Sequence, residues 1–192
     1  MENDALVRDV LLLAYRAFDG SMKGKTMLQK RIYFLSVMLG TELGFDAHYY
    51  GPYSEEVASA NAELKSLGYL SEMASPFGVD QRGFEMARYD YKLTEAGIRL
   101  ADKKAAKMPK MTAAIVKAAN VITEAGNLDY MELSIAAKAY YVLTKLNGKA
   151  TKEDIAGMLP KFGWNVTNEQ LEKATAFLER SQLVAKPITA TH

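Results

Sequence analysis

The sequence predicts a mainly α-helical protein with one small β-hairpin. Through most of the 192 residues, apolar side chains recur three or four positions apart, as on the buried face of a helix. Capping and turn residues separate these runs. Residues 69–93 instead alternate apolar and polar side chains around a turn-rich centre. This order predicts a winged-helix-like N-terminal unit (residues 1–108) and a smaller helix-turn-helix-like unit (109–192) packed on it.

Two helices are predicted before the first break in the chain. The apolar stripe of the first helix has members four positions apart: Leu6, Val10, Ala14 and Phe18. The second helix begins with Thr26 and Gln29, which have the spacing of a capping box. Its cations Lys25, Lys30 and Arg31 lie off the apolar stripe, so we expect them to face water.

A third helix follows the break at Gly51–Pro52. Ser54 is its expected N-cap, and Glu55 and Glu56 in its first turn suit the positive end of the helix dipole. The helix is expected to end at Gly68, and a hairpin over residues 69–93 follows. The two halves of the alternating pattern are out of phase, which predicts a bulge near residues 87–88.

The helices of the second half are predicted mainly from their caps. Thr94 starts a fourth helix that Pro109 interrupts, and residues 111–125 form another helical run. Capping-box spacing recurs in two later pairs: Asp129 with Glu132, and Thr167 with Gln170. A strand-like stub is expected at residues 183–184, after the last helix.

Two segments of the first half resemble a known family. LQKRIYF at residues 28–34 is followed by YGPYSEEV at residues 50–57. In that order they resemble the YwgA-like proteins and, more distantly, the Panacea (SocA-like) antitoxin domains of bacteria and phages. The resemblance covers about the first half of the chain. It implies a small winged-helix-like domain without enzymatic activity and, for the Panacea group, an antitoxin role on an adjacent toxin.

The composition argues against several classes of function. The chain has no cysteine and only two histidines, so we expect no disulfide, no metal site and no cofactor. No nucleophile–base constellation stands out around His48, and we expect the protein not to be an enzyme. The first residues lack the pattern of a signal peptide, and no run is long and apolar enough to span a bilayer. These features predict a cytoplasmic protein.

The distribution of charge leaves two kinds of partner open. The net charge is +1, and the third helix, which reads the major groove in DNA-binding winged helices, is acidic here. Cations gather instead in the second helix, the hairpin and the fourth helix. The candidate nucleic-acid contacts are Lys23, Lys25, Lys30, Arg31, Arg82, Arg88, Lys103, Lys104 and Lys107. The alternative is that these side chains are solvated helix faces.

An aromatic corner between the second and third helices is the candidate protein-binding surface. We expect His48, Tyr49 and Tyr53 to contact a partner, since tyrosine is enriched in interfaces. Tyr50 and Pro52 are better explained as residues that fill the bend. The sequence therefore favours a non-enzymatic regulatory protein that binds a protein partner, with an antitoxin-like role as one form. The alternatives are a winged-helix DNA-binding transcriptional regulator and, for assembly, a homodimer.

Overall fold

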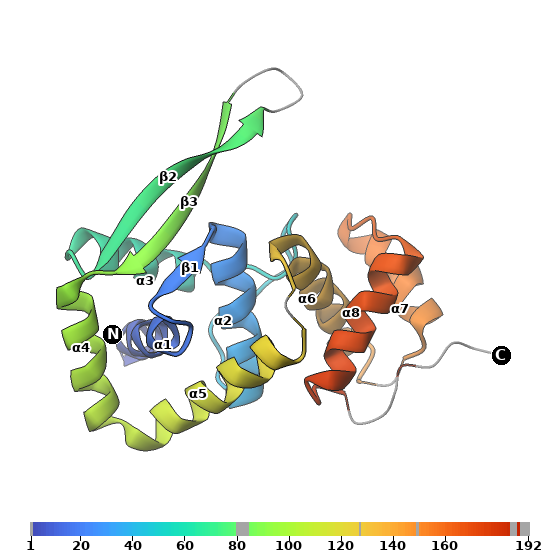
Figure 1. The fold of residues 1–192 in the computed structure, drawn as a ribbon. Coiled ribbons are helices and arrows are strands. Elements are labelled where there is room, and N and C mark those ends of the chain that lie inside the picture. The colour runs from blue at the N-terminus through green and yellow to red at the C-terminus, as the bar shows by residue number, and fades with distance from the viewer. Residues whose placement is uncertain (1, 80–84, 127, 149, 185–187, 189–192) are drawn as a thin grey trace.

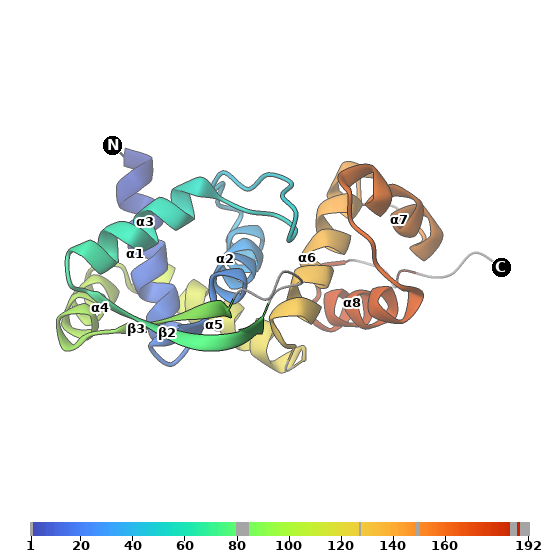
Figure 2. The same cartoon turned by 90° about the horizontal axis from the view of Figure 1, so that it is seen from above.

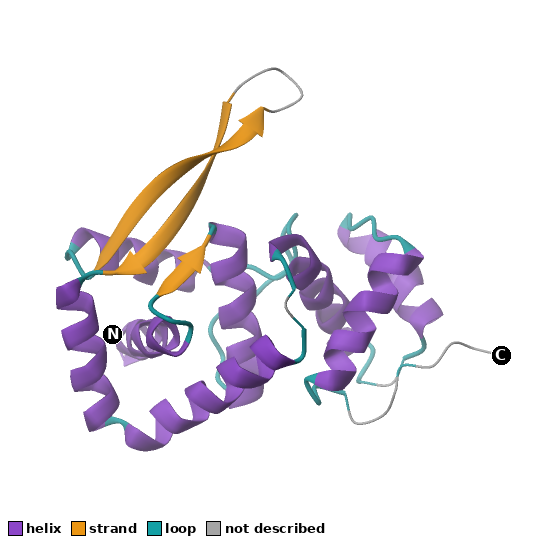
Figure 3. Cartoon of the chain, in the orientation of Figure 1, coloured by secondary structure: helices purple, strands orange, loops and turns teal. Residues whose placement is uncertain are grey.

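The fold is mainly helical, with a small three-stranded antiparallel sheet (Figures 1 and 3). A computed structural model describes residues 2–79, 85–126, 128–148, 150–184 and 188. Within those ranges, no helix combines the length and the apolar character that crossing a membrane requires.

Along the described residues, the α-helices are interrupted by three strands and one 3-10 helix. In chain order they are α1 (Glu2–Ala17), β1 (Ser21–Lys23), α2 (Lys25–Leu39), α3 (Glu55–Ser66), β2 (Leu70–Val79), β3 (Glu85–Leu93), α4 (Glu95–Lys107), α5 (Pro109–Glu124), α6 (Tyr130–Lys145), α7 (Lys152–Met158), a 3-10 helix (Leu159–Phe162) and α8 (Asn168–Arg180).

Helix α1 is the centre of the first half. It packs against α3, α4 and α5, which surround it in Figure 1. Six consecutive residues, 10–15, are buried, so α1 is covered on all sides over this stretch. The single apolar stripe that the sequence predicted for this helix therefore covers less of its surface than is buried. Inside the core, the Tyr15 hydroxyl donates a hydrogen bond to Asn61 Oδ1 on α3 at 2.7 Å.

The sheet has the strand order β1-β3-β2 and projects from the helices as a long hairpin (Figure 1). β1, which the sequence did not indicate, pairs with β3 only from Ser21↔Lys92 to Lys23↔Asp90. β2 continues alongside β3 much farther, to Val79↔Glu85. The register of the two strands shifts between Pro76 and Val79, beside the pair Pro76↔Ala87. The extra residue therefore belongs to β2, whereas we expected the bulge in β3, near residues 87–88.

Helix α6 joins the two halves. It packs on α2 on one side and on α8 on the other, and Figure 2 shows it between them. Its residues 133–139 are all buried. The Phe34 ring of α2 lies 5.2 Å from the Phe177 ring of α8, so the apolar core continues from one half into the other. α5 packs on both α1 and α2.

Most predicted helix starts are confirmed, and two local predictions are wrong. Thr94 accepts a hydrogen bond from Gly97 N–H, and both later capping boxes, at Asp129 and at Thr167, are present. α2 instead begins after Gly24 without a side-chain cap, so the box predicted at Thr26 does not form. The stub predicted at residues 183–184 is not a strand.

Candidate functional site

The corner between α2 and α3 is a tight loop held by its own backbone. Asp46 and Tyr53 exchange two backbone hydrogen bonds, of 3.0 and 2.9 Å, and Gly51 N–H donates to the His48 carbonyl at 2.9 Å. The His48 and Tyr53 rings lie 5.1 Å apart. This arrangement leaves Tyr49 71% exposed at the tip of the loop.

Helix α2 holds one side of the corner. The Gln29 amide donates to the Ser54 carbonyl and accepts from Ser54 N–H, each at 3.0 Å. The Lys30 ammonium donates to the Pro52 carbonyl at 2.6 Å. Lys30 is only 1% exposed, so the expectation that it faces water was wrong. The two sequence segments that carry the family resemblance are thus bonded directly to each other.

The C-terminal half holds the other side of the corner. Ser134 Oγ on α6 donates to the Tyr50 carbonyl at 2.5 Å, and Trp164 Nε1 donates to the His48 carbonyl at 2.8 Å. Lys138, one turn beyond Ser134, lies beneath Gly51, with its ammonium 5.8 Å from the centre of the Trp164 ring. Backbone carbonyls of the corner therefore accept bonds from both halves of the chain.

The two buried lysines have unusual electrostatics. Burial lowers the pKa of Lys30 to about 7, and the nearby charge of Lys138 lowers it further in the same direction. Burial also lowers the pKa of Lys138. Neither ammonium is paired with a carboxylate among the described residues. Lys30 thus supports the corner from inside the protein, through its hydrogen bond to the Pro52 carbonyl.

A groove of about 410 Å³ runs between the hairpin, the start of α2, Tyr50 and the start of α6. We call it the hairpin groove. Among the described residues, its lining combines three cations, three tyrosines and three methionines and contains no carboxylate. These residues are Lys23, Lys25, Arg88, Tyr50, Tyr89, Tyr130, Met27, Met86 and Met131, with Gly24, Thr26 and Ala87 between them.

Four of the eight large apolar side chains that are exposed among the described residues line this groove. Tyr50 is 50% exposed, Met86 41%, Met131 39% and Tyr89 37%, which are high values for large apolar residues. The Lys25 ammonium lies 4.9 Å from the centre of the Tyr89 ring, and the Arg88 guanidinium bonds both Asp90 carboxylate oxygens. The lining thus offers apolar surface with positive charge at its margin.

The groove contains three of the predicted nucleic-acid contacts and none of the three predicted corner contacts. Lys23, Lys25 and Arg88 come together there. Tyr50, which we assigned to the bend, lines the groove, whereas Tyr53 lines a smaller hollow of about 180 Å³ beside α3 and β2. The sequence analysis missed Tyr89, Tyr130 and the three methionines, because they lie far apart along the chain.

The other predicted contacts are dispersed. Arg31 is half-buried, with its guanidinium 4.4 Å from the Phe18 ring centre, so its predicted exposure is only partial. Lys104 on α4 pairs with Asp9 at 2.6 Å, while Lys103 and Lys107 on the same helix are exposed. Figure 1 places α4 on the far side of α1 from α2 and α6, away from the hairpin groove. Arg82 lies outside the described residues.

Helix α3 presents acidic side chains to solvent, as predicted. Ser54 caps it by accepting from Val57 N–H, and Glu55 and Glu56 in its first turn are exposed. Glu63 pairs with Arg8 at the surface, and both side chains remain partly exposed. Phosphates would meet repulsion along this face of the helix.

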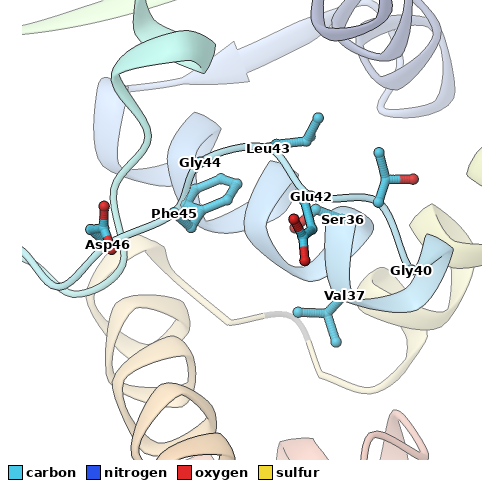
Figure 4. Close-up of a pocket in the computed structure, with 9 residues that line it drawn as sticks. Ser36, Val37, Gly40, Glu42, Leu43, Gly44, Phe45 and Asp46 are labelled. Atoms are coloured by element: carbon cyan, nitrogen blue, oxygen red, sulfur yellow. The ribbon is translucent and has the colours of Figure 1, made fainter. Parts of the chain in front are cut away.

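A broader hollow of about 500 Å³ is lined by residues of 36–46, at the end of α2 and in the loop that follows it (Figure 4). The polar side chains labelled there include Ser36, Glu42 and Asp46. Ser36 Oγ is already bonded to the Tyr33 carbonyl at 2.7 Å. Among the described residues, no three His, Asp or Glu side chains are grouped as a metal site would require.

Part of the chain is similar in sequence to a bacterial protein. No protein-family model matches the chain. The chain is 38% identical over 93 residues to the uncharacterised protein YwgA of Bacillus subtilis (strain 168). This match covers 48% of the chain and spans about half the length of YwgA (52%). The resemblance to YwgA-like proteins is confirmed over that half, and the one to Panacea domains stays a prediction.

Proposed function

We propose that this protein is a non-enzymatic regulatory protein that binds a protein partner in the hairpin groove. The observation that carries the proposal is the convergence of Tyr50, Met86, Tyr89 and Met131, each more than one third exposed, on one concave surface. Large exposed apolar patches on a folded chain favour association with another molecule. Methionines and tyrosines are residue types over-represented in protein interfaces.

The order of the elements supports a winged-helix-like assignment for the N-terminal half. Helix, short strand, two helices and a hairpin follow one another, and the short strand β1 adds to the hairpin as a third strand. In this assignment β2 and β3 are the wing, and the hairpin groove lies beside the wing. An antitoxin-like role, which the Panacea resemblance implies, is one form that partner binding would take.

The second candidate function is a DNA-binding transcriptional regulator. Lys23, Lys25 and Arg88 at the base of the hairpin favour it, since a wing can contact phosphates. The acidic exposed face of α3 opposes it, because Glu55 and Glu56 would lie where base-reading side chains are needed. We therefore place the protein partner first.

A charged substitution in the lining of the hairpin groove should weaken capture of the partner strongly. Met131→Glu puts a carboxylate on the apolar wall, and we expect it to reduce capture of the partner from a lysate of the source cells by at least tenfold. Met73→Glu is the matched control, because Met73 is exposed on β2 and does not line the groove. Affinity capture with quantitative mass spectrometry measures the difference.

The proposal fails if every protein captured by the wild type is captured equally by Met131→Glu. It also fails if neither form enriches a protein while both shift duplex DNA in a gel. Loss of affinity with rising salt, in proportion to the phosphates neutralised, would then support the regulator instead.

A further inference from the structure

The charge around the hairpin groove specifies the chemistry of its occupant. Of the twelve described residues that line the groove, three are cations and none is acidic. Arg88 is bound to Asp90, so its charge is largely compensated within the protein. Lys23 and Lys25 are exposed and form no ion pair with a described carboxylate. These two ammonium groups therefore keep positive charge at the margin of an apolar surface.

The start of α2 adds to this positive charge. Gly24 is the N-cap, no side chain caps the helix, and its first turn holds no acidic residue. The N–H groups of residues 25–27 therefore lack partners within the helix, and the dipole places partial positive charge at this end. Gly24, Lys25, Thr26 and Met27 all line the groove, so this helix end faces the same space as the apolar side chains.

Lys138 is a further cation, which lies outside the groove lining, one turn beyond Ser134 on α6 and beside Gly51. It is 91% buried, forms no hydrogen bond with a described residue, and its nitrogen is not sealed from solvent. Its ammonium lies 5.8 Å from the centre of the Trp164 ring, a cation–π contact. Tyr130, Ser134 and Lys138 stand four positions apart, so one face of α6 leads from the groove, past the Tyr50 carbonyl, to this ammonium.

We propose that the occupant of the hairpin groove is an acidic segment of a protein, with one or more large apolar side chains between its carboxylates. The apolar side chains pack on Met27, Met86 and Met131, whose flexible thioethers fit irregular shapes. The carboxylates lie against Lys23, Lys25 and the start of α2. This inference rests on the proposed function and specifies the partner that it requires.

Nucleic acid fits the same surface less well. Single-stranded nucleic acid is bound by a cationic groove that follows its backbone, together with aromatic rings that stack its bases. Here the cations lie only at the margin, and methionines line the groove as much as tyrosines do. The neighbouring α3 also exposes Glu55 and Glu56. A segment with both carboxylates and large apolar side chains can contact the cationic margin and the apolar walls of the groove.

Two peptides that differ only in charge test the inference. Each is 15 residues long, carries a fluorophore and has leucine or phenylalanine at every third or fourth position. One has glutamate at the remaining positions and the other has lysine. Fluorescence anisotropy at low and moderate salt should show that the wild type binds the glutamate peptide at least tenfold more tightly. Single-stranded and duplex DNA of 15 nucleotides are measured in parallel.

Charge reversal at Lys25 locates the effect. Lys25→Glu should lower the preference for the glutamate peptide at least fivefold, and the folded state should be retained because glutamate is favoured at a helix N-terminus. Lys103→Glu, on the exposed face of α4, should leave the preference unchanged. Equal binding of the two peptides, no binding of either, or tighter binding of DNA would overturn the inference.

The inference and the proposed function can fail separately. If a captured partner depends on Met131 but binds Lys25→Glu as well as the wild type, the protein-binding function stands and the acidic partner does not. If capture does not depend on Met131, both are wrong.

Discussion

Replacing Gly51 by alanine should destabilise the folded protein by about 2–4 kcal/mol. Gly51 has φ +92°, a backbone conformation that residues with a Cβ rarely adopt. An added Cβ would lie 3.0 Å from Lys138 Cγ, 3.3 Å from the Ser134 carbonyl oxygen and 3.4 Å from Lys30 Cε. The Ser134 carbonyl belongs to the backbone of α6 and cannot move aside. The substitution therefore combines backbone strain with overpacking.

Gly40→Ala is the matched control for this prediction. Gly40 also has a left-handed conformation, with φ +63°, but no heavy atom would lie within 4 Å of an added Cβ. Its substitution should cost only about 1 kcal/mol, the backbone contribution alone. Urea unfolding of both variants gives the two free energies. Equal losses at the two positions would show that the corner is not packed between α2 and α6 as described.

Stability should rise with pH between about 7.5 and 9.5 because of Lys30. Its pKa is about 7 in the folded protein, against the usual 10.5. Between these values the unfolded chain binds a proton that the folded protein does not, so raising the pH favours folding. The stabilisation is complete above the unfolded pKa and is lost as the pH falls toward the folded pKa. One such group contributes at most about 1.4 kcal/mol per pH unit.

The window ends near pH 10, because other buried groups then act in the opposite direction. Burial raises the pKa of Tyr15, Tyr33 and Tyr91, so the folded state retains phenolic protons that the unfolded chain loses, and stability falls. Lys138, whose pKa is also lowered, acts in the same direction as Lys30. The two lysines thus determine the slope below pH 9.5.

Lys30→Met isolates the contribution of this lysine. Methionine fills similar space without a charge, so the rise in unfolding free energy between pH 7.5 and 9.5 should fall to half or less of the wild-type value. Lys103→Met, at an exposed position on α4, should keep the full slope. Urea titrations at five pH values measure it. A wild-type slope of zero, or one unaffected by Lys30→Met, contradicts the buried, unpaired ammonium.

Local sequence signals predicted the helices well. Asp129 with Glu132 and Thr167 with Gln170 form the boxes that their spacing indicates. Gln29 has the same spacing from Thr26, yet its amide is bonded to the backbone of Ser54. A tertiary contact between segments 25 residues apart outweighed the local one, and spacing alone carries no information about that competition.

The burial of Lys30 also results from tertiary contacts, so the sequence pattern did not predict it. Helical periodicity places it beside the apolar stripe and not on it, and lysine is almost never fully buried. It is buried because the corner and α6 cover that side of α2, with the Pro52 carbonyl as acceptor. Short strand β1 was missed because three residues are too few for an alternating pattern.

The hairpin groove could be predicted only in part. Lys23, Lys25 and Arg88 were singled out from their charge, and the structure brings them together. Tyr89 and Met131 join them from β3 and α6, more than forty residues apart in the chain. That meeting depends on how α6 packs on α2, which no local pattern in the sequence encodes.

Hydrogen–deuterium exchange with and without the captured partner tests partner binding in the groove most directly. The amides of residues 25–27 have no partner within α2, so they exchange quickly in the free protein and should become protected in the complex. Residues 86–89 and 130–131 should be protected with them. Protection confined to α3, with the start of α2 and the hairpin unchanged, would contradict binding in the hairpin groove.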